Sequence, residues 1–496
     1  MKTKRILALI LCALMLVPAL ASCGSGDDAG TPSGDTAAAD TTAAETTAAE
    51  TSEYEAPEVN YDGAEVTLAV IDYVTTGTAS SWVASSYCEG FMPEQNGDIL
   101  NDAIYERNQT VEEELGVKLG FFSMTSFSNA ASEFQKPVLA GEDLIDFGLM
   151  NGGGMPKLMG TDYLVELTDL DLDLSYSWWD QGSIEEFTVF DKLHTVTGDI
   201  SLNAAYAPIT LFFNKALVKD FDLEDPYKTV YDGSWTLDKS MEMCYAVAAD
   251  LNGNGQVDIE DRFGMLFEGS TLGNMVLSSG ERFTTRDSDG VPQPAINTER
   301  TAKVLEKFIP FMLDKETNVL NSNYTNLGYK NVFTDLMLPM FIDDRALFYN
   351  NQLLVALNLR DMEADFGVLP TPKLEESQDK YYIPYSNHWA TFVVVPVTNS
   401  QYDMTADVIQ SMGYHSQQLV IKAYIDVTVM DKALRDEDSV AMLDIILNNR
   451  VYDIGQIFSW NLTGVISITT PNLASTYASK EESILAAMQK SIELLR

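Results

Sequence analysis

Two kinds of apolar pattern alternate along residues 57–496. Short apolar runs between polar or turn residues are typical of buried strands. Apolar residues spaced three and four apart are typical of amphipathic helices, and they predict a helix over 98–115 that ends at Gly116. Thr236 has the residue type and the position of an N-cap for a further helix. The predicted strands are 64–71, 117–124, 143–150, 208–213, 345–349 and 391–397, and the predicted C-terminal helices are 403–424, 439–450 and 480–495.

The order of these elements predicts the fold class. A strand, a helix, a strand and a further strand that runs into the glycine loop 152–154 are typical of an α/β lobe with a largely parallel sheet. About 440 residues follow the N-terminal segments, which is too long for one hydrophobic core. We therefore expect an α/β protein of two lobes, joined by several crossings of the chain and ending in a mostly helical region.

Residues 1–22 have the pattern of a secretory signal peptide. Three basic residues among the first five precede an apolar stretch over 6–20, which is shorter than the ~20 residues of a membrane-spanning helix. Residues 20–23, of sequence LASC, resemble a bacterial lipobox. The resemblance implies that the signal is cut before Cys23 and that Cys23 is diacylated, with palmitate as an expected acyl group. An ordinary cleavage site with a chance cysteine is the alternative.

Residues 23–56 predict a disordered tether that is acidic and rich in Ala and Thr. After Cys23, the segment contains no aliphatic residue larger than Ala and a single aromatic residue, Tyr54. Such a composition buries too little apolar surface to offset the entropy of ordering. A flexible chain of this length spans about 30 Å. We therefore expect a folded body held by its lipid at the extracellular face of a cell membrane.

The charge of the chain limits its partners. Removal of the signal would leave 28 basic residues against 74 acidic ones, a net charge of −46. Such a body does not bind nucleic acid or an anionic bilayer through charge. A neutral or cationic ligand fits this charge better than a polyanion does. Adaptation of an exported protein for solubility explains the same composition.

Several stretches of the body, in this order, resemble the extracellular solute-binding lipoproteins of ABC importers, and the carbohydrate-binding branch in particular. They are residues 101–108 (NDAIYERN), 178–180 (WWD), 213–215 (FNK), 233–238 (GSWTLD), 250–255 (DLNGNG) and 366–373 (FGVLPTPK). Each stretch is unspecific alone, and the ordered series behind a lipobox and a tether carries the resemblance.

The resemblance implies a periplasmic-binding-protein-like fold with a ligand cleft between two lobes. By analogy, the first lobe is 57–210 plus 348–394, and the second is 211–347 plus 395–496. It also implies that the protein is no enzyme, binds an extracellular sugar or oligosaccharide, and delivers it to the permease subunits of an ABC importer.

Residues 250–261 predict a calcium loop. Calcium takes six to eight oxygen ligands, and a twelve-residue loop supplies them from positions 1, 3, 5, 7, 9 and 12 around a glycine at position 6. The sequence has Gly255 at position 6 and an aspartate in place of the usual glutamate at position 12. We expect a structural calcium ion, with a metal-free Asx/Gly-rich turn as the alternative. The predicted ligands are Asp250, Asn252, Asn254, the Gln256 carbonyl, Asp258 and Asp261.

Candidate ligand-binding residues lie beside the ends of the predicted strands, where ligands bind to open α/β sheets. A sugar site needs an aromatic ring for the apolar C–H face and polar side chains for the hydroxyls. Trp389 is the leading candidate for the stacking ring, with packing at the hinge between the lobes as its alternative. The candidates are Asp72, Tyr73, Trp82, Asn151, Asn350, Asn351, Asn387, His388 and Trp389.

Motifs of common catalytic sites are absent from the sequence. It contains no GxSxG, HExxH, GxxxxGK or CxxC, and the body has three histidines and two cysteines, Cys88 and Cys244. Hydrolysis of a glycoside by a pair of carboxylates stays an open alternative, because any two of the 74 acidic residues could form such a pair. The alternatives to a sugar receptor are a receptor for a peptide or a cationic solute, a secreted glycoside hydrolase, and a calcium-dependent adhesion protein.

Overall fold

Two β-sheets organise the part of the chain that the structure describes. The structure is a computed structural model, and it describes residues 54–75, 87–159, 161–360, 362–386, 389–430, 436–470 and 472–496, without the side chains of 427–430. The predicted signal peptide, Cys23 and nearly all of the predicted tether lie outside these ranges. Each sheet is covered by helices, which confirms the predicted two-lobe α/β fold.

The first sheet is mostly parallel. Its strands are β1 (Ala64–Ile71), β2 (Val117–Met124), β3 (Phe147–Asn151) and β12 (Thr391–Val394), in the order β12-β3-β1-β2. β1 runs parallel to β2 and β3, and β12 runs antiparallel to β3. Helices α1 (Ile99–Leu115) and α2 (Ala130–Ala140) connect the parallel strands, as such pairs require.

Local sequence signals explain α1. The Asp98 carboxylate accepts hydrogen bonds from the backbone N–H groups of Leu100 and Asn101, and Gly116 ends the helix in the left-handed conformation with φ 64°. Between these caps the apolar face, which includes Ile104 and Val111, is fully buried. The helix predicted over 98–115 and the strands predicted over 64–71 and 117–124 are confirmed. The strand predicted to begin at residue 143 begins at Phe147.

The second sheet mixes parallel and antiparallel pairs. Its order is β10-β4-β9-β5-β8, from strands β4 (Ile209–Asn214), β5 (Phe263–Phe267), β8 (Asn318–Leu320), β9 (Ala346–Gln352) and β10 (Phe366–Pro370). β4 runs antiparallel to β9 and β10, and β5 runs parallel to β8 and β9. The helices around this sheet are α5 (Lys215–Asp220), α6 (Pro226–Tyr231), α7 (Leu237–Val247), α8 (Thr271–Ser278), α9 (Glu299–Leu313), α10 (Leu338–Ile342) and α13 (Glu437–Asn448).

The strand pairings divide the chain differently from the lobes expected by analogy. β9 and β10 lie in the second sheet, although the range 348–394, which contains most of β9 and all of β10, was expected in the first lobe. Helix α11 (Tyr402–His415) packs on α1 beside the first sheet, although it was expected in the second lobe. The hydrogen bonds that decide these places join residues more than a hundred positions apart, such as Phe212 and Tyr349, and no local pattern encodes them.

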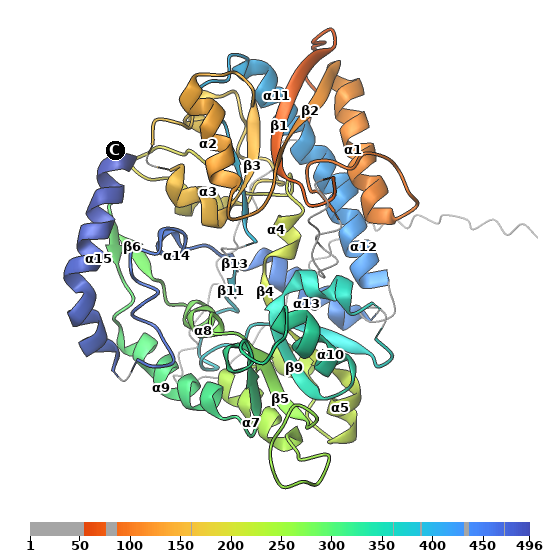
Figure 1. Cartoon of the computed structure of the whole chain (residues 1–496), viewed down its shortest axis with the longest axis vertical. Helices are drawn as coiled ribbons and strands as arrows, with labels where there is room; N and C mark the ends of the chain where they lie inside the picture. The colour runs from red at the N-terminus through yellow and green to blue at the C-terminus, as the bar shows by residue number, and fades with distance from the viewer. Residues whose placement is uncertain are drawn as a thin grey trace, which may run out of the picture. The chain divides into compact units, whose positions relative to one another are not determined.

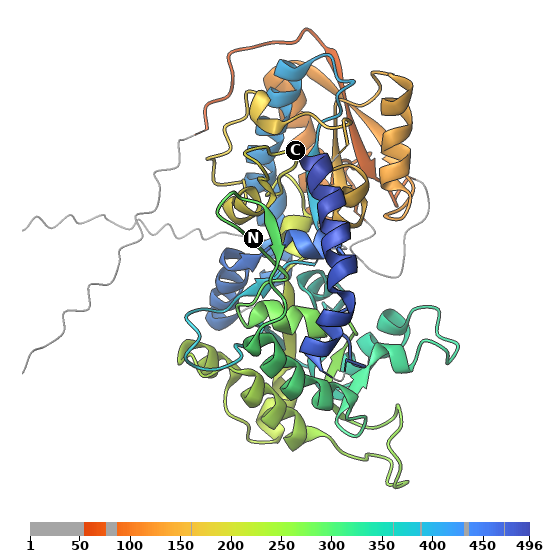
Figure 2. The ribbon, with the colours of Figure 1, turned by 90° about the vertical axis from the view of Figure 1, so that its left-hand side faces the viewer.

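The C-terminal region is mostly helical, as predicted, and it packs against both lobes. Thr236 caps α7 through a hydrogen bond from the backbone N–H of Lys239, which confirms the predicted N-cap. Helix α15 (Leu473–Leu495) starts beside α9, and the chain beyond it places Arg496 over the ring of Phe190, so that the helix follows both lobes along one side (Figures 1 and 2). The remaining elements are α3 (Gln181–Phe187), α4 (Asn203–Tyr206), α12 (Lys422–Met430), α14 (Ile454–Phe458), β6 (Thr284–Arg286), β7 (Pro292–Pro294), β11 (Ile383–Pro384) and β13 (Arg450–Val451), with short 3-10 or π-helical turns at 152–157, 167–169, 321–323, 333–337, 353–358 and 416–421.

The folded body begins at the end of the predicted tether. The ring of Tyr54 stacks on Tyr414 with 4.4 Å between centroids, and its hydroxyl donates to Glu114 Oε1 at 2.7 Å. Order therefore starts ahead of the expected boundary at residue 57. Cys88 and Cys244 are buried free thiols. Among the described residues, no helix has the length and the apolar character needed to cross a membrane.

Candidate ligand-binding cleft

A cavity of about 850 Å³ lies at the edge of the second sheet. It is lined by the start of β4, the end of β9, the chain from the end of β5 into α8, the segment 321–333, residues 386 and 389, and α14 with the chain that follows it. Its aromatic rings are Phe283, Tyr329, Phe333 and Trp389, and its amide side chains are Asn274, Asn321, Asn331, Asn351, Gln352 and Gln456. The lining therefore combines flat apolar faces with groups that both donate and accept hydrogen bonds.

Charged side chains are scarce in this cavity. Glu268 is the single acidic residue and Lys330 the single basic one among the described residues that line it. Burial raises the pKa of Glu268, and its carboxylate accepts a hydrogen bond from the Ser270 hydroxyl. The surrounding protein carries a large excess of acid, so the near neutrality of this lining is a local property.

Hydrogen bonds at both ends of α8 fix the wall that carries Glu268. At its start, the Thr271 hydroxyl donates to Asn350 Oδ1 at 2.9 Å, and Asn350 Nδ2 donates to the Thr210 carbonyl at 3.0 Å. At its end, Arg300 Nε donates to the Ser279 carbonyl at 2.6 Å and Gln378 Nε2 donates to the Ser278 carbonyl at 2.8 Å.

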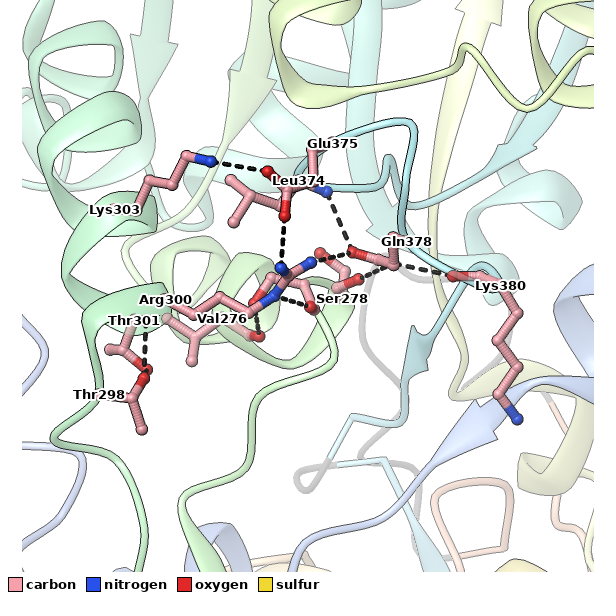
Figure 3. A network of polar contacts seen from close by, with 11 residues as sticks. Val276, Ser278, Thr298, Arg300, Thr301, Lys303, Leu374, Glu375, Gln378 and Lys380 are labelled. Atoms are coloured by element: carbon pink, nitrogen blue, oxygen red, sulfur yellow. Dashed lines mark hydrogen bonds and ion pairs between the residues drawn. The ribbon is translucent and has the colours of Figure 1, made fainter.

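The residues that hold the end of α8 form one polar network (Figure 3). Arg300 and Lys303, both on α9, make ion pairs of 2.7 Å with the Glu375 carboxylate. Arg300 also donates to Gln378 Oε1 at 3.0 Å. The network joins the end of α8 to α9 and to the chain after β10.

A second, smaller pocket of about 30 Å³ lies on the side of the first sheet. It is lined by the chain after β1 and β2, by α4 and by Trp389. The Glu89 carboxylate in its wall accepts a hydrogen bond from the Ser201 hydroxyl, and burial raises its pKa. Trp389 lines both cavities and makes an edge contact with Phe127 at 5.1 Å between centroids. One indole ring therefore joins the two walls of the cleft.

Three of the predicted ligand-binding residues line these cavities. Trp389 lines both, Tyr73 lines the small pocket, and Asn351 lines the large cavity. Trp82, Asn387 and His388 lie outside the described residues.

The other three predicted residues line neither cavity. Asp72 is buried and accepts hydrogen bonds from Thr75 and Ser123. Asn350 supports the start of α8, and Asn151 is buried at the end of β3 opposite Thr391. They follow strand ends, as the sequence indicated, but they point into the protein rather than into a cavity.

Sequence analysis missed Glu268, Glu89, Tyr206 and the segment 321–333. A signal was present for Glu268, because it directly follows the buried apolar run Phe263–Phe267 and so stands at the end of a strand. Tyr206 and segment 321–333 carry no such signal, since their place beside the cleft depends on how distant segments pack.

The predicted calcium loop is held together by its own hydrogen bonds. Asp250 accepts from the backbone N–H groups of Gly253 and Gly255, at 2.7 and 2.8 Å. The amide nitrogens of Asn252 and Asn254 donate to Asp258, and their amide oxygens accept from the backbone N–H groups of Asn254 and Gln256. No group of three or more His, Cys, Asp or Glu side chains in the described ranges is arranged to hold a metal ion. A calcium ion at 250–261 stays a prediction.

No family model and no curated protein matches the sequence. Solved structures, in contrast, match the fold of this chain. An ABC substrate-binding protein from Listeria monocytogenes in complex with cycloalternan matches with 13% identity, a TM-score of 0.54, and coverage of 86% of this chain and 100% of that chain.

Two further structures match over similar lengths. The maltose-binding protein MalE from Listeria monocytogenes in complex with maltose matches with 14% identity, a TM-score of 0.53, and coverage of 87% and 97%. A sugar transporter from Rhizobium etli in an open conformation matches with 11% identity, a TM-score of 0.55, and coverage of 87% and 99%. The chain therefore has the two-lobe fold of sugar-binding ABC solute-binding proteins.

Proposed function

We propose that the protein is a receptor that binds a neutral oligosaccharide in the cleft and delivers it to the permease of an ABC importer. The observation that carries the proposal is the lining of the large cavity, where the described residues supply aromatic rings, six amide side chains, one carboxylate and one ammonium group. Sugars present apolar C–H faces and hydroxyls that donate and accept, so rings and amides suit them. The fold supports the same proposal, because sugar-binding proteins share it.

The size of the cavity favours an oligosaccharide. Ligand pockets in proteins measure roughly 300–1,000 Å³. The large cavity, at about 850 Å³, stands near the upper end of that range. Trp389 provides a ring against which one sugar unit can stack, and the volume of the cavity leaves space for further units.

The charge of the lining argues against the alternatives. A receptor for a cationic solute needs buried carboxylates beside the ligand, and Glu268 is the single one among the described residues of the large cavity. A glycoside hydrolase needs two carboxyl groups that flank one bond. Glu89, a further carboxyl group near the cleft, lies in the wall of the separate small pocket.

Anchoring at the extracellular face of a cell membrane, through a lipid on Cys23, is part of the proposal. The lipobox-like residues 20–23 and the composition of the tether support it. Cells that express the full chain are to be fed a labelled palmitate analogue and fractionated. Label on the wild type and loss of both label and membrane association in Cys23→Ser are expected, and label that persists in this variant would contradict the anchor.

A binding screen tests the ligand class. Thermal shifts and titration calorimetry of the purified protein are to be measured with neutral oligosaccharides, basic peptides and polyamines at two salt concentrations. Binding to the folded state raises its stability by about 2.7 kcal/mol at a hundredfold excess over Kd. We expect a neutral oligosaccharide to bind with little salt dependence and to be recovered intact. Binding of polyamines or peptides alone, or recovery of a cleaved sugar, would overturn the proposal.

A further inference from the structure

A residue that lines the small pocket carries a buried hydroxyl group without a partner. Tyr206, the last residue of α4, is 2% exposed and lines this pocket. Its Oη has no hydrogen-bond partner among the described residues. Burial raises the pKa of Tyr206 well above its ordinary value, so the phenol stays a neutral donor at physiological pH. Buried polar groups in proteins are nearly always hydrogen-bonded, and an exception at a cavity points to a group that enters from outside.

The pocket has room for one such group and an acceptor to match it. Its volume of about 30 Å³ exceeds the roughly 10–15 Å³ that one water molecule needs, so a hydroxyl group fits in it. Glu89 provides a carboxylate in the same wall, held by the Ser201 hydroxyl. A hydroxyl group between Tyr206 and Glu89 can accept from the phenol and donate to the carboxylate at the same time. The lining thus suits an alcohol better than a carbonyl, which can only accept.

The position of Trp389 connects this pocket to the ligand. The indole lines both cavities, so a sugar ring that stacks on it lies beside the opening of the small pocket. Tyr73 and Phe127, which make an edge contact at 5.8 Å between centroids, complete the aromatic wall.

We propose that the small pocket is a subsite that takes a single hydroxyl group of the bound oligosaccharide, with Tyr206 Oη as its donor and Glu89 as its acceptor. This inference rests on the proposed function. The wide cavity then holds the body of the ligand, and the small pocket distinguishes one hydroxyl position from a deoxy or an alkylated one. Tyr206 and Glu89 are specificity-determining residues in this scheme.

Two isosteric variants test the subsite. Tyr206→Phe removes only the hydroxyl, and Glu89→Gln keeps the shape of the side chain. Calorimetric affinities are to be measured for maltotriose first, then for the neutral oligosaccharide that binds best in the screen, and for the monodeoxy analogues of that sugar. Tyr227→Phe is the matched control, because Tyr227 is also a buried tyrosine but lines neither described cavity. Unfolding curves of each variant separate affinity from stability.

We expect about a tenfold loss of affinity in Tyr206→Phe, a tenfold to hundredfold loss in Glu89→Gln, and no change in the control. One monodeoxy analogue should bind weakly to the wild type and lose nothing further in Tyr206→Phe, because both changes remove the same hydrogen bond.

If Tyr206→Phe binds the sugar with unchanged affinity but has altered stability, the pocket holds a structural water. This result would overturn the proposed subsite but not the proposed receptor function. Absence of binding by any neutral oligosaccharide would overturn the receptor and the subsite together.

Discussion

The two walls of the cleft are built in different ways. The wall on the second sheet forms a wide cavity, where neutral amides and aromatic rings come from a helix start, a long loop and strand ends. The wall on the first sheet forms a pocket of about 30 Å³, where a carboxyl group and a phenol are buried. The wide wall can contact most of a ligand, whereas the narrow wall has room to bind only one small group of it. Trp389 lines both walls, so substitutions of Trp389 test this comparison most directly.

The largest effect is expected from Trp389→Ala. Buried aromatic anchors at the centre of a binding site cost 2 kcal/mol or more when truncated, which corresponds to about 30-fold or more in Kd. We expect this loss for the oligosaccharide found in the screen, as measured by calorimetry, and a smaller loss in Trp389→Phe, which keeps a ring. An affinity within twofold of the wild type would remove Trp389 from the site and leave it as packing between the walls.

Two carboxyl groups lie between the two walls: Asp453, which is buried, and Glu186, which is partly exposed. Ile454 N–H donates to Glu186 Oε1 at 2.7 Å, and Asp453 accepts from the backbone N–H of Phe283 at 2.7 Å. Phe283 lines the large cavity, while α3, which carries Glu186, belongs to the first lobe. Burial first, and repulsion from Asp453 second, raise the pKa of Glu186 to about 7, although Arg286 and Arg282 oppose the shift.

The raised pKa predicts how stability depends on pH. Unfolded glutamate ionises near pH 4.3, so between about pH 4 and 7 the folded protein holds a proton that the unfolded chain has lost. The stabilisation of the folded state by protonated Glu186 is full below pH 4, falls as the pH rises and is absent above pH 7. We expect Glu186→Gln to flatten the pH dependence of the free energy of unfolding by about 1–3 kcal/mol across this window.

Glu185→Gln is the matched control for the pH prediction, because it removes a charge from an exposed neighbour. Denaturant unfolding at five or more pH values is the measurement. Equal curves for the two variants would show that the pair holds no extra proton between about pH 4 and 7.

An intermediate effect is expected from Glu268→Gln on the wide wall. The change keeps the shape of the side chain and replaces a charged hydrogen-bond acceptor, which costs about tenfold in affinity. Glu242→Gln, on the exposed face of α7, provides the control. If the wild type cleaves the sugar and Glu268→Gln stops this cleavage, the wide wall is the active site of a hydrolase.

The smallest effect is expected at the predicted calcium loop, which belongs to neither wall of the cleft. If the loop binds the ion, 1 mM calcium should raise Tm by a few degrees and stabilise the fold by about 1 kcal/mol. Asp250→Ala should abolish that shift, whereas Asp289→Ala, in another exposed turn, should not. A Tm that excess chelator leaves unchanged in the wild type would show that 250–261 is a metal-free turn.

Local patterns in the sequence predicted much of the secondary structure. The strands at 64–71 and 117–124, the helix that ends at Gly116 and the N-cap at Thr236 are all confirmed. These features depend on residues within a few positions of one another, which is why the sequence reveals them. The two-lobe α/β class followed from their order and from the resemblance of short stretches to solute-binding proteins.

The composition of the cleft was only partly predictable. Tyr73, Asn351 and Trp389 were identified because they stand beside strand ends or a crossing of the chain. Asp72 and Asn350 satisfy the same rule and point inward, where Ser123 and Thr271 bind them. Whether a polar residue at a strand end faces a ligand or the core depends on its neighbours in space.

The sequence by itself determined where most strands and helices lie and how they are capped, because hydrophobic periodicity and capping residues act locally. The tertiary structure alone decided that β9 and β10 belong to the second sheet, that α11 packs beside the first, and that Tyr206, Glu89 and Trp389 line one pocket. Backbone hydrogen bonds between strands are nearly independent of side-chain identity, so the sequence does not specify a partner strand directly. Packing across the whole chain selects it.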